Sequence, residues 1–344
     1  MKYIYDQTAY RQTECARYNA INKARVDVTK IFESEGFKPY NIYVAESSIP
    51  KMTGTKVLFR YFRMLIDVHS GDELYIQYPI KKSLLTPFYY ILSILKKKGV
   101  RFYFLIHDLD YLRETKYYSY KARILKPLML ADLIVAHTPT MKQHLISEGI
   151  NAEINILHLF GYLTNDPLIN EDYGIKHRNE VIFAGNLVKS GFVRVLMNYN
   201  FKYAKFKMYG LKPDYDFIGE KQYMGAFKPE ETSFIKGAWG LVWDGDSIDD
   251  CTGEFGNYLK YNSSHKLSLY IASGIPVIVW SKSGLAEWIV SNKLGITLDS
   301  LKELDEALES ITNEEYKAIQ RSVRSLSSDI RSGKTLKRAF NICE

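Results

Sequence analysis

The sequence alternates short β-rich runs with helical patterns along almost its whole length, and this alternation restricts the fold more than any other feature. In the first half the β-rich runs are YIY, NIYVA, ELYIQYP, RFYFLIHD and DLIVAHT, and patterns such as NKARVDVTKIFESEG and MKQHLISEG come between or after them. Strands that alternate with helices form parallel sheets with helices on both faces. The sequence therefore predicts an α/β protein.

A second α/β series follows the polar connection GYLTNDPLINEDYGIKHRNE, whose Asn, Asp, Pro and Gly content is typical of a linker. The chain has 344 residues, which is too long for one ordinary domain. We expect two facing Rossmann-like domains, over residues 1–165 and 166–330. The basic, helical end of the chain, residues 331–344, is expected to pack back on the first domain.

The charge balance favours anionic partners but not nucleic acid. Forty-six Lys and Arg against 39 Asp and Glu give a net charge of +7. The basic residues are scattered among acidic ones, which suits a soluble enzyme better than a nucleic-acid-binding module. The three cysteines, Cys15, Cys251 and Cys343, have no paired spacing for a zinc site or disulfide framework, so we expect a cytoplasmic protein.

No segment is expected to cross a membrane, because the longest apolar stretches, FYYILSIL and PLMLADLIVA, have about half the length of a membrane span. Basic segments beside aromatic residues, KKKGVR at 96–101 and KK at 81, predict weak peripheral association with an anionic membrane. A solvated helix end is the alternative interpretation of these lysines.

The stretch SSHKLSLYIASGIPVIVW, residues 263–280, predicts a helix followed by a buried strand. Ser264 can cap the helix, Gly274 ends it, and Val277–Trp280 continues as a strand. Lys266 lies in the first turn, where a cation opposes the helix dipole. This placement predicts an anion such as a diphosphate beside Lys266, with a solvated lysine as the alternative.

In open α/β sheets, ligands bind outside the carboxyl ends of the strands. Lysines at this edge can neutralise phosphates, and a tyrosine can stack on or flank a base. The chain has no GxxxxGK motif and no GxGxxG after a strand, so we expect the nucleotide to be held in another way. The residues predicted to line this nucleotide site are Gly185, Asn186, Lys189, Tyr209, Asp244, Lys260, Tyr261, Asn262, Ser263, Ser264, His265 and Lys266.

Several of these residues belong to the segment between GLVW and the helix at 265, which we expect to be a loop of about twenty residues without secondary structure. A loop of this length is long enough to suggest function, and a flexible surface loop without function is the alternative. Its candidate side chains are those of Asp244, Asp246, Glu254, Lys260, Tyr261 and Asn262.

The first half places an imidazole and two carboxylates after the hydrophobic run RFYFLI, namely His107, Asp108 and Asp110. A general base would lie at such a strand end, and Asp108 is the predicted base, with His107 orienting it. Helix capping by Asp108 or Asp110 is the alternative. Asn19, Ala20 and Lys23, at the start of the first long helix, are predicted to face the same cleft as Asp110. Ordinary capping and solvated charge are the alternatives for that helix start.

The chain resembles GT-B glycosyltransferases close to bacterial β-1,6-galactofuranosyltransferases of surface-polysaccharide assembly, and more distantly the glucosyltransferase 3 branch. The resemblance rests on NKARVDV, LIHDLDYLR, VIFAGNLVKS, GLVWDGDSIDDCTGEFGNYLKYNSSHKLSLY, PVIVW, LAEWIV and IRSGKTLKRAF, and therefore spans nearly the whole length. It implies two facing Rossmann-like domains and no obligate metal or other cofactor. A UDP-sugar donor would bind on the C-terminal domain, with its sugar hydroxyls held by the loop side chains named above. An acceptor would bind on the N-terminal domain, on the side of Asn19, Ala20, Lys23 and Asp110.

The function that this resemblance implies is inverting transfer of galactofuranose from UDP-galactofuranose to a sugar hydroxyl of a growing O-antigen or capsule. The acceptor would be a glycan or lipid-linked saccharide at the inner face of the cell membrane, and homo-oligomerisation is left open. A UDP-glucose-dependent glucosyltransferase acting on a glycoprotein or glycan is the alternative among enzymes. A sugar-nucleotide-binding partner subunit without activity is the alternative outside them.

Overall fold

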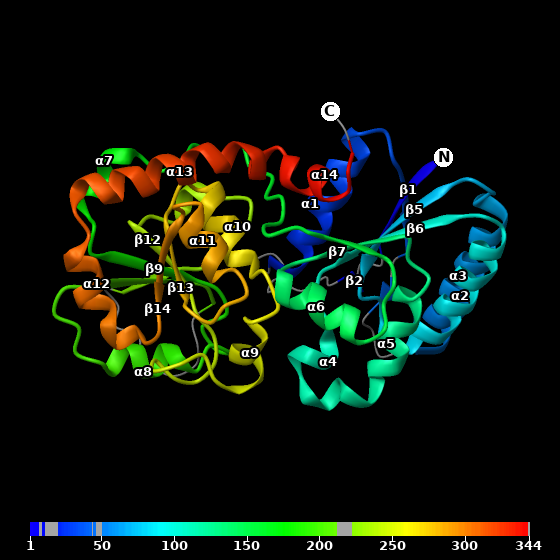
Figure 1. The fold of residues 1–344 in the computed structure, drawn as a ribbon, viewed down its shortest axis with the longest axis horizontal. Coiled ribbons are helices and arrows are strands. Elements are labelled where there is room, and N and C mark those ends of the chain that lie inside the picture. The colour runs from blue at the N-terminus through cyan, green and yellow to red at the C-terminus, as the bar shows by residue number, and fades with distance from the viewer. Residues whose placement is uncertain (7–8, 11–19, 43, 46–49, 212–221, 343–344) are drawn as a thin grey trace. The chain divides into compact units, whose positions relative to one another are not determined.

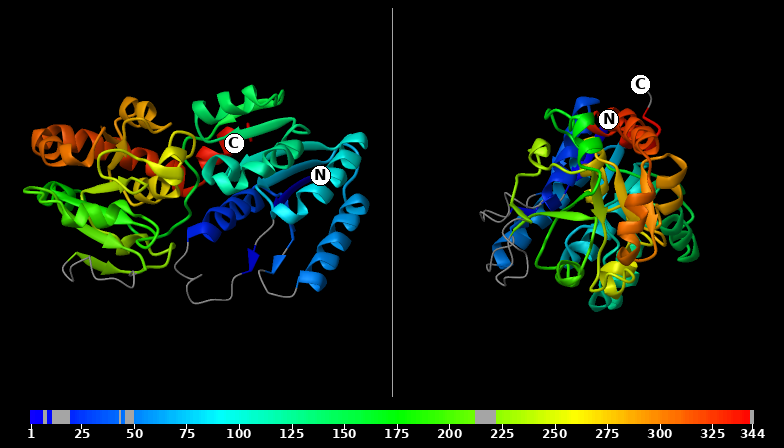
Figure 2. Two further views of the ribbon diagram at one scale, coloured as in Figure 1. Left: turned by 90° about the horizontal axis from the view of Figure 1, so that it is seen from below. Right: turned by 90° about the vertical axis from the view of Figure 1, so that its left-hand side faces the viewer.

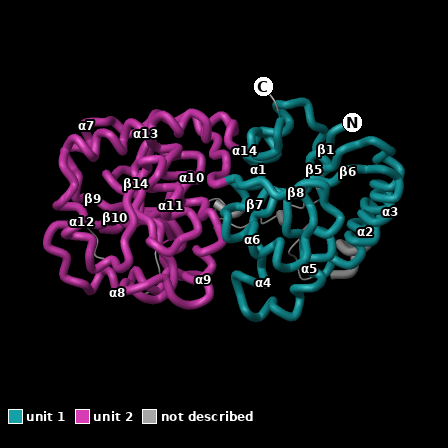
Figure 3. The backbone as a smooth tube through the Cα atoms, viewed as in Figure 1, with its two compact units in different colours: residues 1–16, 21–157, 336–344 teal, residues 17–20, 158–335 magenta. Residues whose placement is uncertain are grey.

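The computed structural model describes residues 1–6, 9–10, 20–42, 44–45, 50–211 and 222–342. The chain divides into two compact units (Figure 3). Unit 1 comprises residues 1–16, 21–157 and 336–344, and unit 2 comprises residues 17–20 and 158–335. Each unit contains a six-stranded parallel sheet with helices against it, so the α/β prediction is confirmed (Figure 1).

The sheet of unit 1 has the strand order β3-β1-β5-β6-β7-β8, and all its pairs are parallel. The chain moves from β1 to β3 on one side and then to β5 on the other, so the strand order reverses between β1 and β5. The strands are β1 (Lys2–Asp6), β3 (Lys38–Asn41), β5 (Glu73–Tyr78), β6 (Arg101–Ile106), β7 (Leu133–Ala136) and β8 (Glu153–Ile156). A separate pair joins β2 (Ala9–Tyr10) to β4 (Val44–Ala45).

The helices of unit 1 connect consecutive strands of this sheet and bury their apolar faces. In α3, for example, Leu85, Phe88, Ile91, Leu92 and Leu95 are buried at helical spacing. The helices are α1 (Ala20–Ser34), α2 (Pro50–Asp67), α3 (Leu85–Lys97), α4 (Asp110–Arg113), α5 (Lys121–Leu128) and α6 (Pro139–Ser147).

The sheet of unit 2 has the order β11-β10-β9-β12-β13-β14, again with parallel pairs only. This is the 3-2-1-4-5-6 order of a doubly wound nucleotide-binding fold, in which ligands bind where the order reverses, here between β9 and β12. The strands are β9 (Glu180–Ala184), β10 (Lys205–Tyr209), β11 (Tyr223–Gly225), β12 (Trp239–Val242), β13 (Val277–Trp280) and β14 (Gly295–Leu298).

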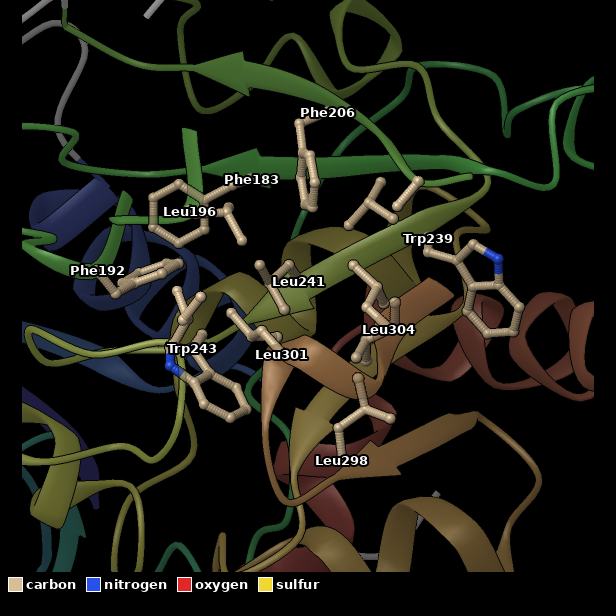
Figure 4. Packing of buried hydrophobic residues seen from close by; sticks show 14 of the residues in the cluster. Phe183, Phe192, Leu196, Phe206, Trp239, Leu241, Trp243, Leu298, Leu301 and Leu304 are labelled. Atoms are coloured by element: carbon tan, nitrogen blue, oxygen red, sulfur yellow. The ribbon is translucent and has the colours of Figure 1, made fainter. Parts of the chain in front are cut away.

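Helices cover both faces of the second sheet, and one of the two cores is rich in large aromatic side chains. Figure 4 shows Leu241 of β12 among Trp243, Phe192 and Leu301, all of them buried. The helices are α7 (Glu171–Lys176), α8 (Phe192–Asn198), α9 (Gly253–Tyr258), α10 (His265–Ala272), α11 (Ala286–Ser291), α12 (Leu304–Ser310) and α13 (Asn313–Arg331). The last helix, α14 (Lys334–Ala339), begins in unit 2 and lies mostly in unit 1.

The boundary between the units lies at 157/158, whereas the sequence analysis placed it at 165/166. The reason is packing, because His158 stacks on Trp288 at a centroid distance of 4.7 Å and Tyr162 is buried in the core of unit 2. At the other end the chain returns to unit 1 at residue 336 rather than 331. Phe340 packs against Phe32 of α1, so the red end of the chain lies beside α1 (Figure 1, Figure 2).

In the described part of the chain, no helix is both long and apolar enough to span a membrane.

Candidate functional site

At the carboxyl end of β9, two glycines allow neighbouring strand ends and the Lys266 side chain to lie unusually close together. Gly185 follows β9, and its backbone N–H donates to the Tyr209 carbonyl at 2.9 Å. A Cβ at Gly185 would lie 2.8 Å from Cε of Lys266, and a Cβ at Gly210 would lie 2.0 Å from the Gly185 carbonyl oxygen. Any larger residue would therefore displace the Lys266 side chain or the neighbouring strand end.

Helix α10 begins as the sequence predicts, and its N-terminus faces this strand end. Ser264 is the N-cap residue with extended backbone, although its hydroxyl makes no capping hydrogen bond. The Lys266 ammonium lies 4.7 Å from the centroid of the Phe183 ring of β9. Among the described residues, no carboxylate forms an ion pair with Lys266. A cation thus lies in the first turn of a helix, beside the strand end where the strand order reverses, and this is an arrangement that suits an anion.

Asp244 lies at the adjacent strand end, two residues after β12. One of its carboxylate oxygens accepts a hydrogen bond from the Gly245 N–H at 3.0 Å. Both Asp244 and Lys266 lie near the Cys251 thiol, whose pKa is raised mainly by burial and is affected by both charges. The structure therefore brings Gly185, Lys266 and Asp244 together from three separate segments.

The segment after Asp244 is not the unstructured loop that we expected, because it contains helix α9. A Cβ at Gly256 would lie 2.5 Å from the carbonyl carbon of Cys251, so α9 packs directly on the preceding backbone. Asp246 turns toward Gly191, where a Cβ would lie 2.1 Å from its Oδ1 atom. Glu254 lies in the first turn of α9 and is exposed.

Asn186 shapes the loop after β9. Its Oδ1 atom accepts hydrogen bonds from the N–H groups of Val188 and Lys189, both at 3.1 Å. The Asn186 side chain is therefore occupied in holding the turn, and Lys189 presents an exposed side chain beyond it.

Residues 259–264 connect α9 to α10, and His265 is the first residue of α10. The predicted ligand-binding residues in this stretch differ in the groups that they expose. The Lys260 ammonium donates to Asn257 at 3.2 Å and lies 5.5 Å from the centroid of the Trp280 ring. Asn262 Oδ1 is buried and has no hydrogen-bond donor among the residues that the structure describes. Tyr261 is half-buried, and Ser263 is buried. The His265 ring packs 5.0 Å from the Tyr162 ring, on the core side of α10.

Tyr209 needs a correction, because its ring is not available for stacking on a base. The side chain is only 3% exposed and packs between Phe227 and Phe234 at centroid distances near 6 Å. Its hydroxyl accepts a hydrogen bond from the Lys236 N–H at 3.0 Å. The residue contributes its backbone to the strand end, while its ring belongs to the core of unit 2.

Tyr209 is also one of the residues that line an open pocket of about 570 Å³ on unit 2. Lys207, another of these residues, donates to Glu180 at 2.6 Å and to the Tyr173 hydroxyl at 2.7 Å. Its ammonium is therefore already satisfied by protein groups.

In unit 1, Asp108 follows β6 and is about one-third exposed. Its carboxylate accepts a hydrogen bond from the Arg113 guanidinium at 2.8 Å. The N-cap residue of α4 is Leu109, whose side chain makes no capping hydrogen bond. Asp110 is the first residue of α4 and pairs with Lys82 at 2.6 Å.

A hydrogen-bond network that the sequence analysis missed orients His107. Gln77 of β5 donates to the Arg25 carbonyl and to Thr29 Oγ1, at 3.2 and 2.9 Å. These two acceptors direct the Gln77 amide oxygen toward His107 Nε2, at 2.8 Å, so this nitrogen carries a proton and donates. Arg25 in turn bonds Asp6 at the end of β1, at 2.6 Å. The network thus joins the ends of β1, β5 and β6.

Lys23 is buried, so its side chain neither faces an acceptor sugar nor lies in solvent, and both of our interpretations of this residue are corrected. It is 5% exposed and pairs with Asp27, one helical turn further along α1, at 2.7 Å. Both side chains of this ion pair are therefore buried inside unit 1. Ala20 is the first residue of α1, and Asn19 lies outside the described residues.

Within the described ranges, no group of three or more His, Cys, Asp or Glu side chains is arranged to hold a metal ion.

Comparison with known proteins identifies similar sequences over almost the whole chain. Residues 9–159 match the N-terminal domain, and residues 181–343 the C-terminal domain, of the glucosyltransferase 3-like family. The chain is 32% identical to the β-1,6-galactofuranosyltransferase WbbI of Escherichia coli (strain K12) over 92% of each chain. It is 27% identical to glucosyltransferase 3 of Streptococcus gordonii over 90% of each chain.

Solved structures show the same fold at low identity. Sucrose-phosphate synthase from Thermosynechococcus elongatus superposes with a TM-score of 0.64 at 9% identity, over 99% of this chain and 98% of that one. HepE from Anabaena, in complex with UDP and glucose, superposes with a TM-score of 0.55 at 12% identity over 100% of both chains. The two parallel six-stranded sheets and these likenesses show the GT-B fold.

Proposed function

Because this chain belongs to the glucosyltransferase 3-like family of glycosyltransferases, we propose that it transfers galactofuranose from UDP-galactofuranose, with inversion, to a sugar hydroxyl of a growing O-antigen or capsule. The choice of sugar is supported by the 32% identity to a protein named as a β-1,6-galactofuranosyltransferase. The choice of UDP is supported by HepE, a protein of the same fold that was solved with UDP and glucose.

The assignment of the donor site depends mainly on one observation, the position of the Lys266 side chain beside Gly185. An ammonium without a carboxylate partner among the described residues lies where the strand order reverses, in the first turn of α10. We assign the diphosphate to this place, with Lys189 as a second cation on the exposed side of the loop. Positive charge there stabilises the departing UDP, and we expect no obligate metal.

The sugar is assigned to the segment between Asp244 and Asn262. The buried Asn262 Oδ1 atom can accept a hydrogen bond from a sugar hydroxyl, and the second carboxylate oxygen of Asp244 can do the same. A buried acceptor that gains a donor only when the sugar is bound would favour the correct substrate, because an unsatisfied polar group costs about 1 to 3 kcal/mol.

Asp108 is assigned as the general base. As the acceptor oxygen attacks the anomeric carbon, its proton passes to Asp108, and the bond from that carbon to the diphosphate breaks. Arg113 holds the carboxylate in position, and the Gln77 network fixes the tautomer of the neighbouring His107. In this scheme the inversion follows from a single displacement.

A second function is supported by the other relatives. The chain is 27% and 24% identical to two streptococcal proteins named glucosyltransferase 3. The alternative is therefore transfer of glucose from UDP-glucose to a glycoprotein or glycan. A donor-binding subunit without activity would keep the Lys266 site and would not need Asp108.

Calorimetry with UDP, UDP-galactofuranose, UDP-galactopyranose and UDP-glucose, followed by turnover on a panel of lipid-linked and synthetic glycosides, tests the proposal. Preferred turnover of UDP-galactofuranose supports it, and preferred turnover of UDP-glucose supports the alternative. Tight UDP binding without turnover of any donor would indicate the subunit. Failure to bind UDP would overturn all three.

A further inference from the structure

Helix α2 exposes a stripe of large apolar side chains on the side that faces away from the core. Phe59, Phe62 and Ile66 are 69%, 62% and 75% exposed. Tyr61 and Met64, on the other side of the same helix, are fully buried. At 100° per residue the three exposed side chains lie opposite the buried ones, so α2 is apolar on two faces. Three neighbouring exposed large apolar residues usually indicate an interaction surface.

Helix α3 extends this surface. It packs against α2, where the ring centroids of Tyr61 and Phe88 are 5.7 Å apart, and the two helices lie side by side in Figure 1. Tyr90 and Ile94, on its outward side, are 62% and 44% exposed. We call these five outward residues of α2 and α3 the apolar face: Phe59, Phe62, Ile66, Tyr90 and Ile94.

The charges beside the apolar face are almost all positive. Lys56, Arg60 and Arg63 project from α2 next to the stripe, and all three are exposed. Among the described side chains of α2 the only acidic group is Asp67, which pairs with Arg63 at 3.3 Å. Helix α3 has no acidic residue, and Lys97 lies at its exposed end.

This charge pattern distinguishes between two occupants. A second copy of the chain that packed its apolar face on this one would bring Arg60 and Lys56 of both copies together, and the like charges would repel. An anionic lipid surface would instead accept the apolar side chains between its headgroups and pair with the cations around them. We propose that the apolar face of α2 and α3 docks unit 1 on an anionic membrane.

Two of the lysines that first suggested membrane binding, Lys96 and Lys98, have partners within the protein. Lys96 pairs with Asp132 at 2.6 Å, and Lys98 donates to the Leu65 carbonyl at 2.6 Å. The membrane contact is therefore assigned to α2 and the exposed side of α3, and of the KKKGVR segment only Lys97, at the end of α3, is part of it. It goes beyond the transfer reaction, since it requires neither a donor nor an acceptor sugar.

Sedimentation of the full chain with vesicles tests the proposal. The vesicles consist of phosphatidylcholine alone, or of phosphatidylcholine with phosphatidylglycerol, at low and at high salt. We expect binding to the anionic vesicles only, weakened by salt. Phe59→Ser with Phe62→Ser should reduce the partition at least about tenfold, because two large apolar side chains leave the interface. Arg60→Glu with Arg63→Glu should do the same.

Matched controls use exposed residues of unit 2. Val195→Ser with Val290→Ser removes two exposed apolar side chains, and Lys317→Glu with Arg321→Glu reverses two exposed charges on α13. Both controls should bind vesicles like the unchanged protein, and all variants should keep their UDP affinity and melting temperature.

Three results would overturn the proposal. They are absence of binding to anionic vesicles, undiminished binding of the Phe59 and Phe62 variant, and a wild-type oligomer that this variant converts to monomers. None of them depends on the donor, so a wrong donor assignment would leave the vesicle result unchanged.

Discussion

Replacing Lys266 by methionine tests the donor site most directly, because methionine keeps the apolar stem beside Gly185 and removes the charge. A hydrogen bond from an ammonium to a phosphate contributes about 1.5 to 3 kcal/mol. At about 1.4 kcal/mol per decade, UDP should bind roughly 10- to 140-fold more weakly. The fold should persist. The lost contact with the Phe183 ring contributes only about 0.5 to 1 kcal/mol, and removing a cation from the start of α10 offsets part of it.

Calorimetric titration with UDP measures this change, and the melting temperature is recorded on the same preparation. Lys317→Met, on an exposed position of α13, is the matched control and should bind UDP normally. Gly185→Ala keeps the Lys266 charge but places a Cβ 2.8 Å from its stem, so it should also weaken UDP binding. A folded Lys266→Met protein with unchanged UDP affinity would refute the assignment and leave Lys266 as an ordinary helix-start residue.

Three further predictions concern the base, the metal and a buried histidine. Asp108→Asn should lower transfer about 100- to 10,000-fold, because an amide cannot take up the acceptor proton. The amide oxygen can still accept from Arg113, so the local structure should persist and UDP affinity should be unchanged. Near-normal turnover would move the base to a neighbouring side chain. Activity should persist in excess EDTA, and a loss that manganese restores would instead make Asp244 and Asp246 metal ligands. Burial lowers the pKa of His137 to about 4, so the unfolded chain binds its proton first as the pH falls from about 6.5. This residue should therefore cost up to about 3 kcal/mol of stability between pH 6.5 and 4, and His137→Gln should flatten the pH dependence of unfolding; an unchanged slope would contradict the assignment.

The parts of the site that the sequence predicted are those encoded by local signals. The cap at Ser264, the glycine at 274 and the apolar run at 277–280 lie within one short stretch, and the structure contains the helix and strand that they predict. Helix α9 was missed because GEFGNY contains two glycines and has low helix propensity. It forms through tertiary packing, where Gly256 contacts the backbone of Cys251.

The parts that could not be predicted depend on distant residues. Whether the Tyr209 ring faces a ligand or the core is decided by Phe227 and Phe234, which cover that side of β10. The network at His107 joins Arg25 to Gln77, 52 positions apart, and no local pattern indicates it. The sequence indicates this network only through the position of Gln77, a polar residue near the carboxyl end of an apolar strand.

The return of the chain to unit 1 has a consequence for synthesis. Phe340 completes the aromatic cluster around Phe32 and Tyr75, with centroid distances of 5.4 and 5.3 Å, and the Ala339 carbonyl accepts from Asn155 at 3.0 Å. The ribosome makes residues 158–335 of unit 2 before these contacts can form, which takes roughly ten to forty seconds at about 5 to 20 residues per second. During that interval the nascent first unit exposes Phe32 and Tyr75. The aromatic cluster of unit 1 is therefore completed only by residues that are translated after unit 2. A chaperone would be needed most during this interval.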